Sequence, residues 1–344
     1  MRAIKKQNQG RMMPLNRTNS KMSASAFRHE LSKETTISLD FGYLSGVIES
    51  WWEKNKEQSL HTLKIQLTNL LINYLRPEDT VYFDQVGASN GVAAVCIKNV
   101  FTSDCPALAL TVHEALADLF HLTDIKYEYE DHKALYLKPS AEKYREWGNG
   151  YGDITPHSDD LYESLNVDYL ALTVCRDTTH TPTAYYFPAD LLISLNDEEI
   201  QTLLGMQAIF VSGKNVSGSK ERVRNVVEYN EQYGYRFSLD FRIDIHSGER
   251  MRAFNGGQEV LDKIRAGLSA AKCNVSTAQT GTFLIVANNK ILHARPTLNI
   301  SADDVRSQAA TSTLNTTPRL LFRSKGPRKQ YYSLDEKHTV QEAI

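Results

Sequence analysis

The residues best suited to chemistry lie in the stretch 155–162, which places an imidazole and a carboxylate two positions apart, at His157 and Asp159. In an extended segment, residues i and i+2 point to the same side, so these two side chains could hold one metal ion together. A second imidazole would have to come from a distant part of the chain, and His293 is the best candidate. Two imidazoles and one carboxylate on one side of an ion leave its other coordination positions open.

A His-x-Asp motif alone is weak evidence for a metal, because a single histidine is more often a satisfied polar residue than a ligand. The prediction gains support from the order of features that follow the motif. A segment rich in predicted strands separates the pair from His293, and a strand with two arginines, residues 318–323, comes after it. Together these features favour a 2-His-1-carboxylate site, the donor set typical of non-haem iron.

The composition narrows the class of protein. The chain has 344 residues, of which 41% are hydrophobic, and its formal net charge is −2. This balance gives no global reason to expect a nucleic acid or an anionic membrane as partner. No apolar run reaches the roughly 18 residues that a membrane-spanning helix needs, so we predict no membrane segment.

The cysteines and the first residues bear on the compartment. The four cysteines are scattered without Cys-x-x-Cys spacing and no secretory signal is evident, so we predict reduced thiols and a cytoplasmic protein. Residues 1–29 contain seven Lys or Arg and no Asp or Glu, and polar residues interrupt any apolar face. We therefore predict a disordered basic leader over 1–29, in preference to a transit peptide.

Periodicity predicts helices in the first part of the chain and strands in the second. We expect a helical N-terminal part over about 40–125, with an apolar strand at 91–98 and helices at 47–52, 60–74 and 107–122. We expect the core over about 126–330, with helices at 196–204 and 258–271 and with strands at 169–175, 183–187, 208–211, 235–245, 282–287 and 319–323.

This order of elements predicts an α+β fold with a double-stranded β-helix, or jelly-roll, core and flanking and inserted helices. We find no internal repeat and no Gly-x-Gly-x-x-Gly motif after a strand. Residues 30–344 are therefore predicted to form a single catalytic domain.

The motifs resemble those of the Fe(II)/2-oxoglutarate-dependent oxygenases, and among them the clavaminate synthase-like branch, which includes hydroxylases of free arginine, asparagine and lysine. The resemblance covers about residues 80–330. It rests on an ordered set of features: His157-x-Asp159, a Thr some two dozen residues on, Asn288-Asn289 before His293-x-Arg295, and Arg319-x-x-x-Arg323.

The resemblance implies roles for these residues, with Fe(II), 2-oxoglutarate and O2 as cofactor and co-substrates. His157, Asp159 and His293 would be the iron ligands. Thr183, or else Thr181, would bond the 2-oxoglutarate carboxylate, Arg319 would hold its distal carboxylate, and Arg323 would meet the carboxylate of an amino-acid substrate. The segment 299–317 is longer than the branch leads us to expect, so Arg295 or Arg306 remain alternatives to Arg319.

The charge of the substrate is predicted from acidic residues. In the arginine hydroxylases that this chain resembles, acidic residues at a similar distance before the distal histidine hold the guanidinium, and Asp244 takes that position here. Asp240 and Asp160 would add negative charge, with Asp240, Arg242 and Asp244 on one face of a strand. We therefore predict hydroxylation of free L-lysine or L-arginine at C3 or C4. The alternative is that Asp244 pairs with Arg242 or with a neighbouring strand.

Other functions remain open at this stage. A hydroxylase of a dicarboxylate would need a basic pocket, and a carrier-bound or peptide-bound amino acid is a further candidate substrate. A non-catalytic jelly-roll binding protein and a zinc hydrolase are less favoured, because the metal motif is intact and His-Glu-x-x-His is missing. The carboxylate at Asp159 also disfavours a halogenase. The sequence leaves a homo-oligomer open.

Overall fold

The structure is a computed structural model that describes residues 22–123, 135–140, 149–213, 220–244, 248–276, 278–301, 303–305, 313–314 and 316–329. Its helices are α1 (Ala24–Leu31), α2 (Gly42–Asn55), α3 (Leu60–Tyr74), α4 (Pro77–Gln85), α5 (Pro106–Leu119), α6 (Pro188–Leu191), α7 (Asp197–Gly205) and α8 (Gln258–Gly267). Within the described residues, no helix is long and apolar enough to cross a membrane.

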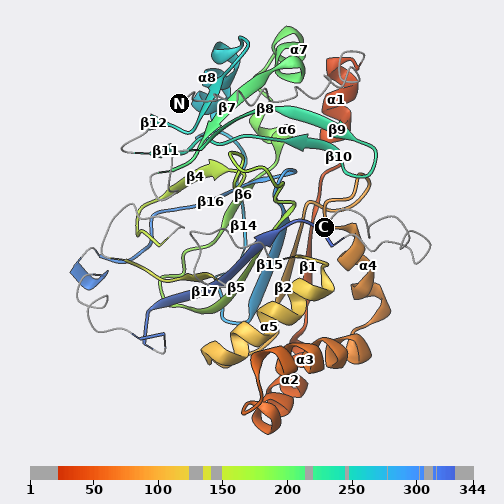
Figure 1. Cartoon of the computed structure of the whole chain (residues 1–344), viewed down its shortest axis with the longest axis vertical. Coiled ribbons are helices and arrows are strands. Elements are labelled where there is room, and N and C mark those ends of the chain that lie inside the picture. Colours follow the sequence, from red (N-terminus) through yellow and green to blue (C-terminus); the bar gives the residue numbers. More distant parts are fainter. Residues whose placement is uncertain are drawn as a thin grey trace, which may run out of the picture.

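The strands fall into one large sheet, one smaller sheet opposite it and a peripheral group (Figure 1). The six-stranded sheet contains β1 (Thr36–Asp40), β2 (Ala94–Lys98), β15 (Thr282–Ala287), β5 (Tyr169–Asp177), β17 (Arg319–Gly326) and β3 (Leu135–Leu137), in that order. The four-stranded sheet contains β14 (Asn274–Val275), β6 (Ala184–Tyr186), β16 (Leu292–Arg295) and β4 (Ile154–His157). The remaining strands are β7 (Gln207–Val211), β8 (Glu221–Asn225), β9 (Val227–Asn230), β10 (Gly234–Phe237), β11 (Ile243–Asp244), β12 (Gly248–Glu249) and β13 (Met251–Ala253).

The helical N-terminal part packs on one face of the six-stranded sheet, as Figure 1 shows. On α3, Leu63, Leu67 and Leu71 recur every four residues and are buried against α5. Helix α5 in turn lies on β5, β15 and β17. The helices predicted at 60–74 and 107–122 are therefore confirmed.

The central strands β5 and β15 are apolar throughout because both of their faces are covered. Tyr169 and Ala171 of β5 face the helical side, whereas Leu170 and Leu172 belong to a second apolar cluster that also contains Tyr185 of the four-stranded sheet. The two sheets thus pack face to face around that cluster. Mixed helices and sheets of this kind confirm the α+β prediction.

A further layer of helices and strands covers the opposite end of the molecule from α2 and α3 (Figure 1). Helices α1, α7 and α8 share an apolar cluster with β7, β10 and β13. Phe27 of α1 is fully buried there, edge-on to Tyr235 with 4.8 Å between ring centroids. The predicted leader is thus wrong at its end, because residues 24–29 are helical; residues 1–21 lie outside the described residues.

The strand predicted at 235–245 is wrong, because the structure breaks it into β10 and the short β11. Between them the chain leaves its hairpin with β9 and bonds to the end of β4. The N–H of Ser158 donates to the carbonyl of Leu239 at 2.8 Å, and the N–H of Phe241 donates to the carbonyl of Pro156 at 3.1 Å. The assumption that Asp240, Arg242 and Asp244 share one strand face fails with it.

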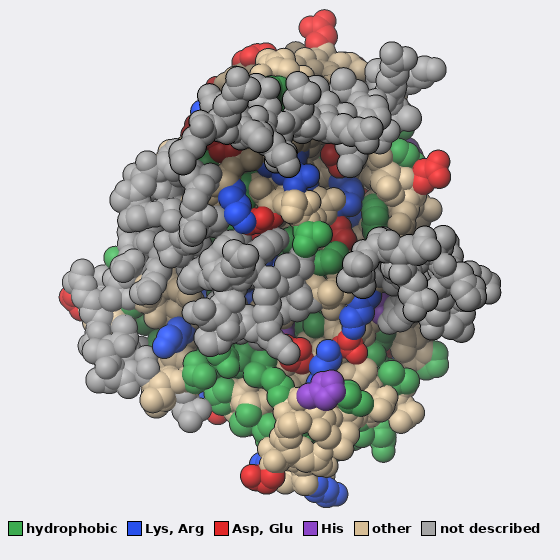
Figure 2. Space-filling model, viewed as in Figure 1, with side chains coloured by type: hydrophobic (Ala, Val, Ile, Leu, Met, Phe, Trp, Pro, Cys, Tyr) green, Lys and Arg blue, Asp and Glu red, His purple; other side chains and the backbone are tan. Residues whose placement is uncertain are grey.

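His113 of α5 is fully buried, and its ring nitrogens bond the hydroxyls of Thr173 at 2.8 Å and Ser324 at 2.9 Å. The four cysteines, all of them among the described residues, form no disulfide. Figure 2 shows acidic and basic side chains interspersed over the upper and middle parts of one face and hydrophobic side chains gathered over its lower, helical part.

Candidate metal centre and active site

The two histidines of the predicted triad lie opposite each other on neighbouring antiparallel strands. His157 at the end of β4 pairs in register with His293 of β16, with 4.1 Å between ring centroids. Asp159 follows two residues after His157, and its Oδ1 lies 3.3 Å from Nε2 of His157 and 3.8 Å from Nε2 of His293. One ligand atom from each of the three residues lies within 4.8 Å of the others, so the group is able to hold a metal ion.

Hydrogen bonding and burial set the protonation states that a metal needs. Nδ1 of His157 lies 2.8 Å from the carbonyl of Thr155; a carbonyl only accepts, so Nδ1 carries the proton and Nε2 is left as the donor atom. Burial lowers the pKa of His293 well below its usual value, and His157 adds to the shift. Burial would raise the pKa of Asp159, but His157, His293 and Arg323 outweigh it and hold the pKa well below its usual value. A metal ion binds imidazole through an unprotonated nitrogen and carboxylate in its ionised form, and the lowered pKa values of His293 and Asp159 favour these forms.

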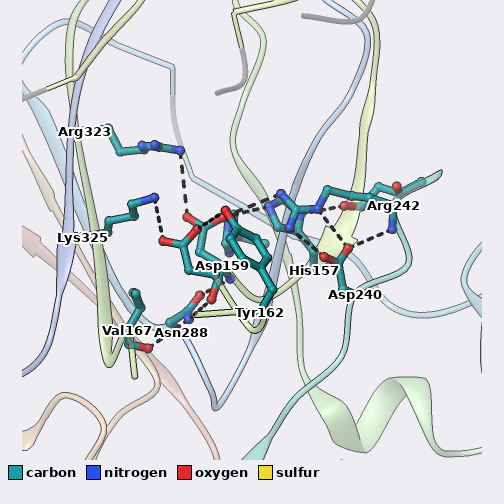
Figure 3. Close-up of polar contacts among 12 residues, drawn as sticks. His157, Asp159, Tyr162, Val167, Asp240, Arg242, Asn288, Arg323 and Lys325 are labelled. Carbon is teal, nitrogen blue, oxygen red and sulfur yellow. Dashed lines mark hydrogen bonds and ion pairs between the residues drawn. The ribbon is translucent and has the colours of Figure 1, made fainter. Parts of the chain in front are cut away.

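Asn288 fixes the loop that carries Asp159 (Figure 3). The backbone N–H of Asp159 donates to Oδ1 of Asn288 at 2.8 Å, and Nδ2 of Asn288 donates to the carbonyls of Asp159 at 3.2 Å and Val167 at 3.0 Å. Asn288 is completely buried in the turn between β15 and β16. The sequence offered Asn288 only as a motif residue; an amide after an apolar strand was the signal for this positioning contact.

Two guanidinium groups flank the carboxylate of Asp159, as Figure 3 shows. Nη1 of Arg323, on β17, lies 3.9 Å from Oδ2, and Nη1 of Arg242, beyond β10, lies 3.8 Å from Oδ1. Arg323, predicted to meet the carboxylate of the substrate, therefore lies beside Asp159 of the triad. Arg242 was expected only as a partner for neighbouring acids, and its approach to Asp159 was missed.

Two of the three acidic residues predicted to bind a cationic substrate are engaged by cations of the chain itself. Asp160 lies 2.6 Å from Nζ of Lys325 and also accepts from the hydroxyl of Tyr162 at 3.1 Å. Asp240 accepts from Nε of Arg242 at 2.9 Å and from Nη2 at 2.7 Å. The backbone of Asp244 lies in β11, and its side chain is outside the described part of the structure.

Arg319 lies at the other end of β17 from Lys325 and is buried. Its Nε donates to Oδ2 of Asp177 at 2.9 Å across the register of β17 and β5. Arg295, the alternative to Arg319, donates from Nη2 to the carbonyls of Gly150 and Gly152. Burial, reinforced by Arg319, lowers the pKa of Arg295 to about 9.

The two threonines considered for 2-oxoglutarate differ in environment. Thr183 precedes β6, and its carbonyl accepts from the N–H of Ser276 at 2.9 Å. Thr181 is buried, and its hydroxyl oxygen accepts from the N–H of Asn299 at 3.2 Å. Their roles stay predictions, as do those of the arginines. Arg306 lies outside the described residues.

Comparison with known proteins gives structural likeness alone. No protein-family model and no curated protein matches the sequence. The structure is similar to that of the non-heme iron oxygenase OrfP in complex with Fe and alpha-ketoglutaric acid, with a TM-score of 0.61, 15% sequence identity, and coverage of 86% of this chain and 94% of that chain.

Two further OrfP structures give the same result at the same coverage. The complex with Fe, succinate and (3S)-hydroxy-L-Arg has a TM-score of 0.63 at 16% identity, and the complex with Fe and L-Arg has 0.59 at 16%. The chain therefore shares the fold of this oxygenase over most of its length, as the resemblance predicted.

Proposed function

We propose that this protein is an Fe(II)- and 2-oxoglutarate-dependent oxygenase that hydroxylates an unactivated C–H bond of a small amino acid. One observation carries the proposal: His157, Asp159 and His293 converge with ligand atoms within 4.8 Å, in a fold shared with OrfP, whose structures contain Fe and alpha-ketoglutaric acid. We infer that the two facing sheets are the halves of the predicted jelly roll.

The donor set fits Fe(II). Two neutral imidazoles and one carboxylate bind this ion on one face and leave positions open for a co-substrate and O2. When bound there with 2-oxoglutarate, the iron supplies O2 activation for C–H hydroxylation, with succinate and CO2 as co-products.

The chain's own residues hold and orient these groups. The Thr155 carbonyl fixes the tautomer of His157, and Asn288 fixes the backbone of Asp159. We propose that Arg319, with Thr183 beside β6, binds 2-oxoglutarate. Among the described residues, Asp177 bonds Arg319 on its Nε side, and a guanidinium has five N–H groups, which supports a second carboxylate partner. Arg323 is proposed to bind the carboxylate of the amino acid.

Two substrates are considered. The OrfP structures with L-Arg and L-homoarginine support the finer prediction, free L-lysine or L-arginine oxidised at C3 or C4. Asp160 and Asp240 are already in ion pairs, which weakens that prediction. Asp244 is then the remaining acidic residue proposed to bind a cationic side chain. A substrate with a second carboxylate is the other candidate, and Arg242 and Arg323 favour it. The compartment is proposed to be the cytoplasm, in keeping with four cysteines that form no disulfide.

The test begins without any primary substrate. Anaerobic addition of Fe(II) and then 2-oxoglutarate should give a weak visible charge-transfer band, and aerobic incubation should give slow succinate release. Asp159→Ala should lose both. Asp262→Ala, which removes a half-exposed carboxylate on α8, should keep both. A folded protein that binds no Fe(II) would refute the proposal.

The second stage uses the twenty amino acids and short dicarboxylates. A substrate is expected to accelerate succinate release and to give a product heavier by one oxygen atom in mass spectrometry. Fe(II) and 2-oxoglutarate binding without such a product from any of them would keep the oxygenase class and redirect the search to carrier-bound or peptide-bound amino acids.

A further inference from the structure

We propose that the primary substrate carries two carboxylates and that Arg242, held in place by Asp240, binds the second one. The substrate class is thus an amino acid with an acidic side chain or a short dicarboxylate. This inference rests on the proposed oxygenase function and deepens it by assigning the charge of the substrate.

The first support is the placement of two guanidinium groups on the two sides of one carboxylate. Arg323 approaches Oδ2 of Asp159 at 3.9 Å and Arg242 approaches Oδ1 at 3.8 Å. Both distances exceed the usual length of a hydrogen bond, so neither arginine is bonded to Asp159. The two groups come from different elements, β17 and the segment after β10, so a molecule that lies over the metal centre meets one at each end (Figure 3).

The second support is the way Asp240 holds Arg242. Asp240 is buried, and its carboxylate takes the Nε and Nη2 side of the guanidinium at 2.9 and 2.7 Å, while it also accepts from the backbone N–H of Arg242 at 3.0 Å. A guanidinium is planar and can bind a carboxylate on more than one edge. With one edge fixed by Asp240, the edge that carries Nη1 is turned toward Asp159. Arg242 is therefore a preorganised anion-binding group beside the metal centre.

The third support is the charge balance of the described side chains around the centre. Asp160 is matched by Lys325 and Asp240 by Arg242, both within 2.7 Å, and Asp159 is the metal ligand. A lysine or arginine side chain entering beside Arg242 would meet like charge, and among the described side chains the neighbouring carboxylates of Asp160 and Asp240 are already paired. A carboxylate in the same place would meet a fixed donor.

The test measures binding separately from turnover. The full chain, loaded anaerobically with Fe(II) and 2-oxoglutarate, is titrated in a calorimeter with L-glutamate, L-aspartate, glutarate, L-arginine and L-lysine. We expect binding of one or more of the three acidic probes and weaker binding of the two cationic ones. Glutarate against L-glutamate distinguishes a plain dicarboxylate from an acidic amino acid.

Variants assign the effect to Arg242. Arg242→Ala should raise the Kd of the acidic probe about 10- to 100-fold, the range for loss of a charge-assisted hydrogen bond to a buried group, and leave the Kd of 2-oxoglutarate unchanged. Arg242→Glu should reverse the order of acidic and cationic probes. Asp240→Asn should raise the Kd of the acidic probe less than Arg242→Ala does, because Arg242 keeps its charge and loses only the ion pair that orients it. Arg252→Ala, an exposed arginine on β13, is the matched control and should change none of these constants.

The outcomes separate the two levels of the argument. Tight binding of L-arginine or L-lysine with no effect of Arg242→Ala overturns the inference and leaves the oxygenase function standing. Failure of the unsubstituted protein to bind Fe(II) and 2-oxoglutarate overturns the function itself. If Arg242→Ala does not fold, Arg242→Gln keeps the stem and one donor group and should still raise the Kd of the acidic probe.

Discussion

Replacing Asn288 by alanine tests how far the turn between β15 and β16 governs the metal centre. The change removes hydrogen bonds to the N–H and carbonyl of Asp159 and to the carbonyl of Val167, all of them buried. A buried polar group left without its partner costs about 1–3 kcal/mol. The carbonyl of Val167 keeps Asn289 as a donor, so the loss falls on the N–H and the carbonyl of Asp159, and we expect the free energy of unfolding to fall by roughly 2–6 kcal/mol.

The same substitution should weaken Fe(II) binding, because Asn288 fixes the backbone of Asp159, a proposed metal ligand. Loss of such orienting contacts typically costs about 10- to 100-fold in metal affinity. The assay pairs urea denaturation of the metal-free protein with anaerobic Fe(II) titration. Asn289 supplies the matched control, because in the described part of the structure its Nδ2 donates only to the carbonyl of Val167, at 3.2 Å.

Asn289→Ala should cost about 1 kcal/mol of stability and leave the Kd for Fe(II) unchanged. Asn288→Asp keeps an acceptor for the N–H of Asp159 but donates nothing, so it should fall between the two if Asn288→Ala is too unstable to study. Equal losses of stability in Asn288→Ala and Asn289→Ala, with the same Fe(II) affinity in both, would refute the reasoning.

Three further predictions concern pH, co-substrate and packing. Burial lowers the pKa of His113 to about 3 from an unfolded value of 6.5, so below pH 6.5 the unfolded chain takes up a proton that the folded chain cannot. The free energy of unfolding should therefore fall by about 1.4 kcal/mol per pH unit as the pH drops below 6.5. His113→Gln should lack this pH dependence when denaturation is measured at pH 7.5, 6 and 5. Arg319→Ala should raise the KM for 2-oxoglutarate at least 10-fold with an unchanged Kd for Fe(II); an unchanged KM would reassign that role to Arg295. Phe27→Ala should cost about 3–5 kcal/mol of unfolding free energy, whereas Phe254→Ala, 55% exposed, should change it by less than about 0.5 kcal/mol.

The metal triad could be predicted because it depends on local geometry and on one long-range pairing. The i, i+2 spacing of His157 and Asp159 is visible in the sequence. His293 follows a continuous apolar run, residues 282–287, which indicates a buried core strand. Regularly spaced leucines likewise indicated α3, and continuous apolar runs indicated the strands β5 and β15. In each case the pattern repeats over several residues, so that a single irregular position does not change the result.

What the sequence could not indicate were the partners of charged and polar side chains. The pairing of Asp160 with Lys325 depends on how β17 lies beside the metal loop, which no spacing records. The burial of His113 could not be predicted either, because the hydroxyls that satisfy it come from distant strands. The helix α1 was missed for the same reason: Phe27 in a basic, polar stretch has nothing nearby in the sequence to pack against.

The hydrogen bonds between Asn288 and the backbone of Asp159 also have a consequence for the order of events in folding. These two residues are 129 positions apart in the chain, and the two histidines stand on strands that meet only in the assembled four-stranded sheet. Contacts of such sequence separation form slowly, because the intervening chain must first be brought together. We therefore expect the three metal ligands to come together only after the sheets have formed, so that a metal ion would bind the folded protein and would not nucleate its folding.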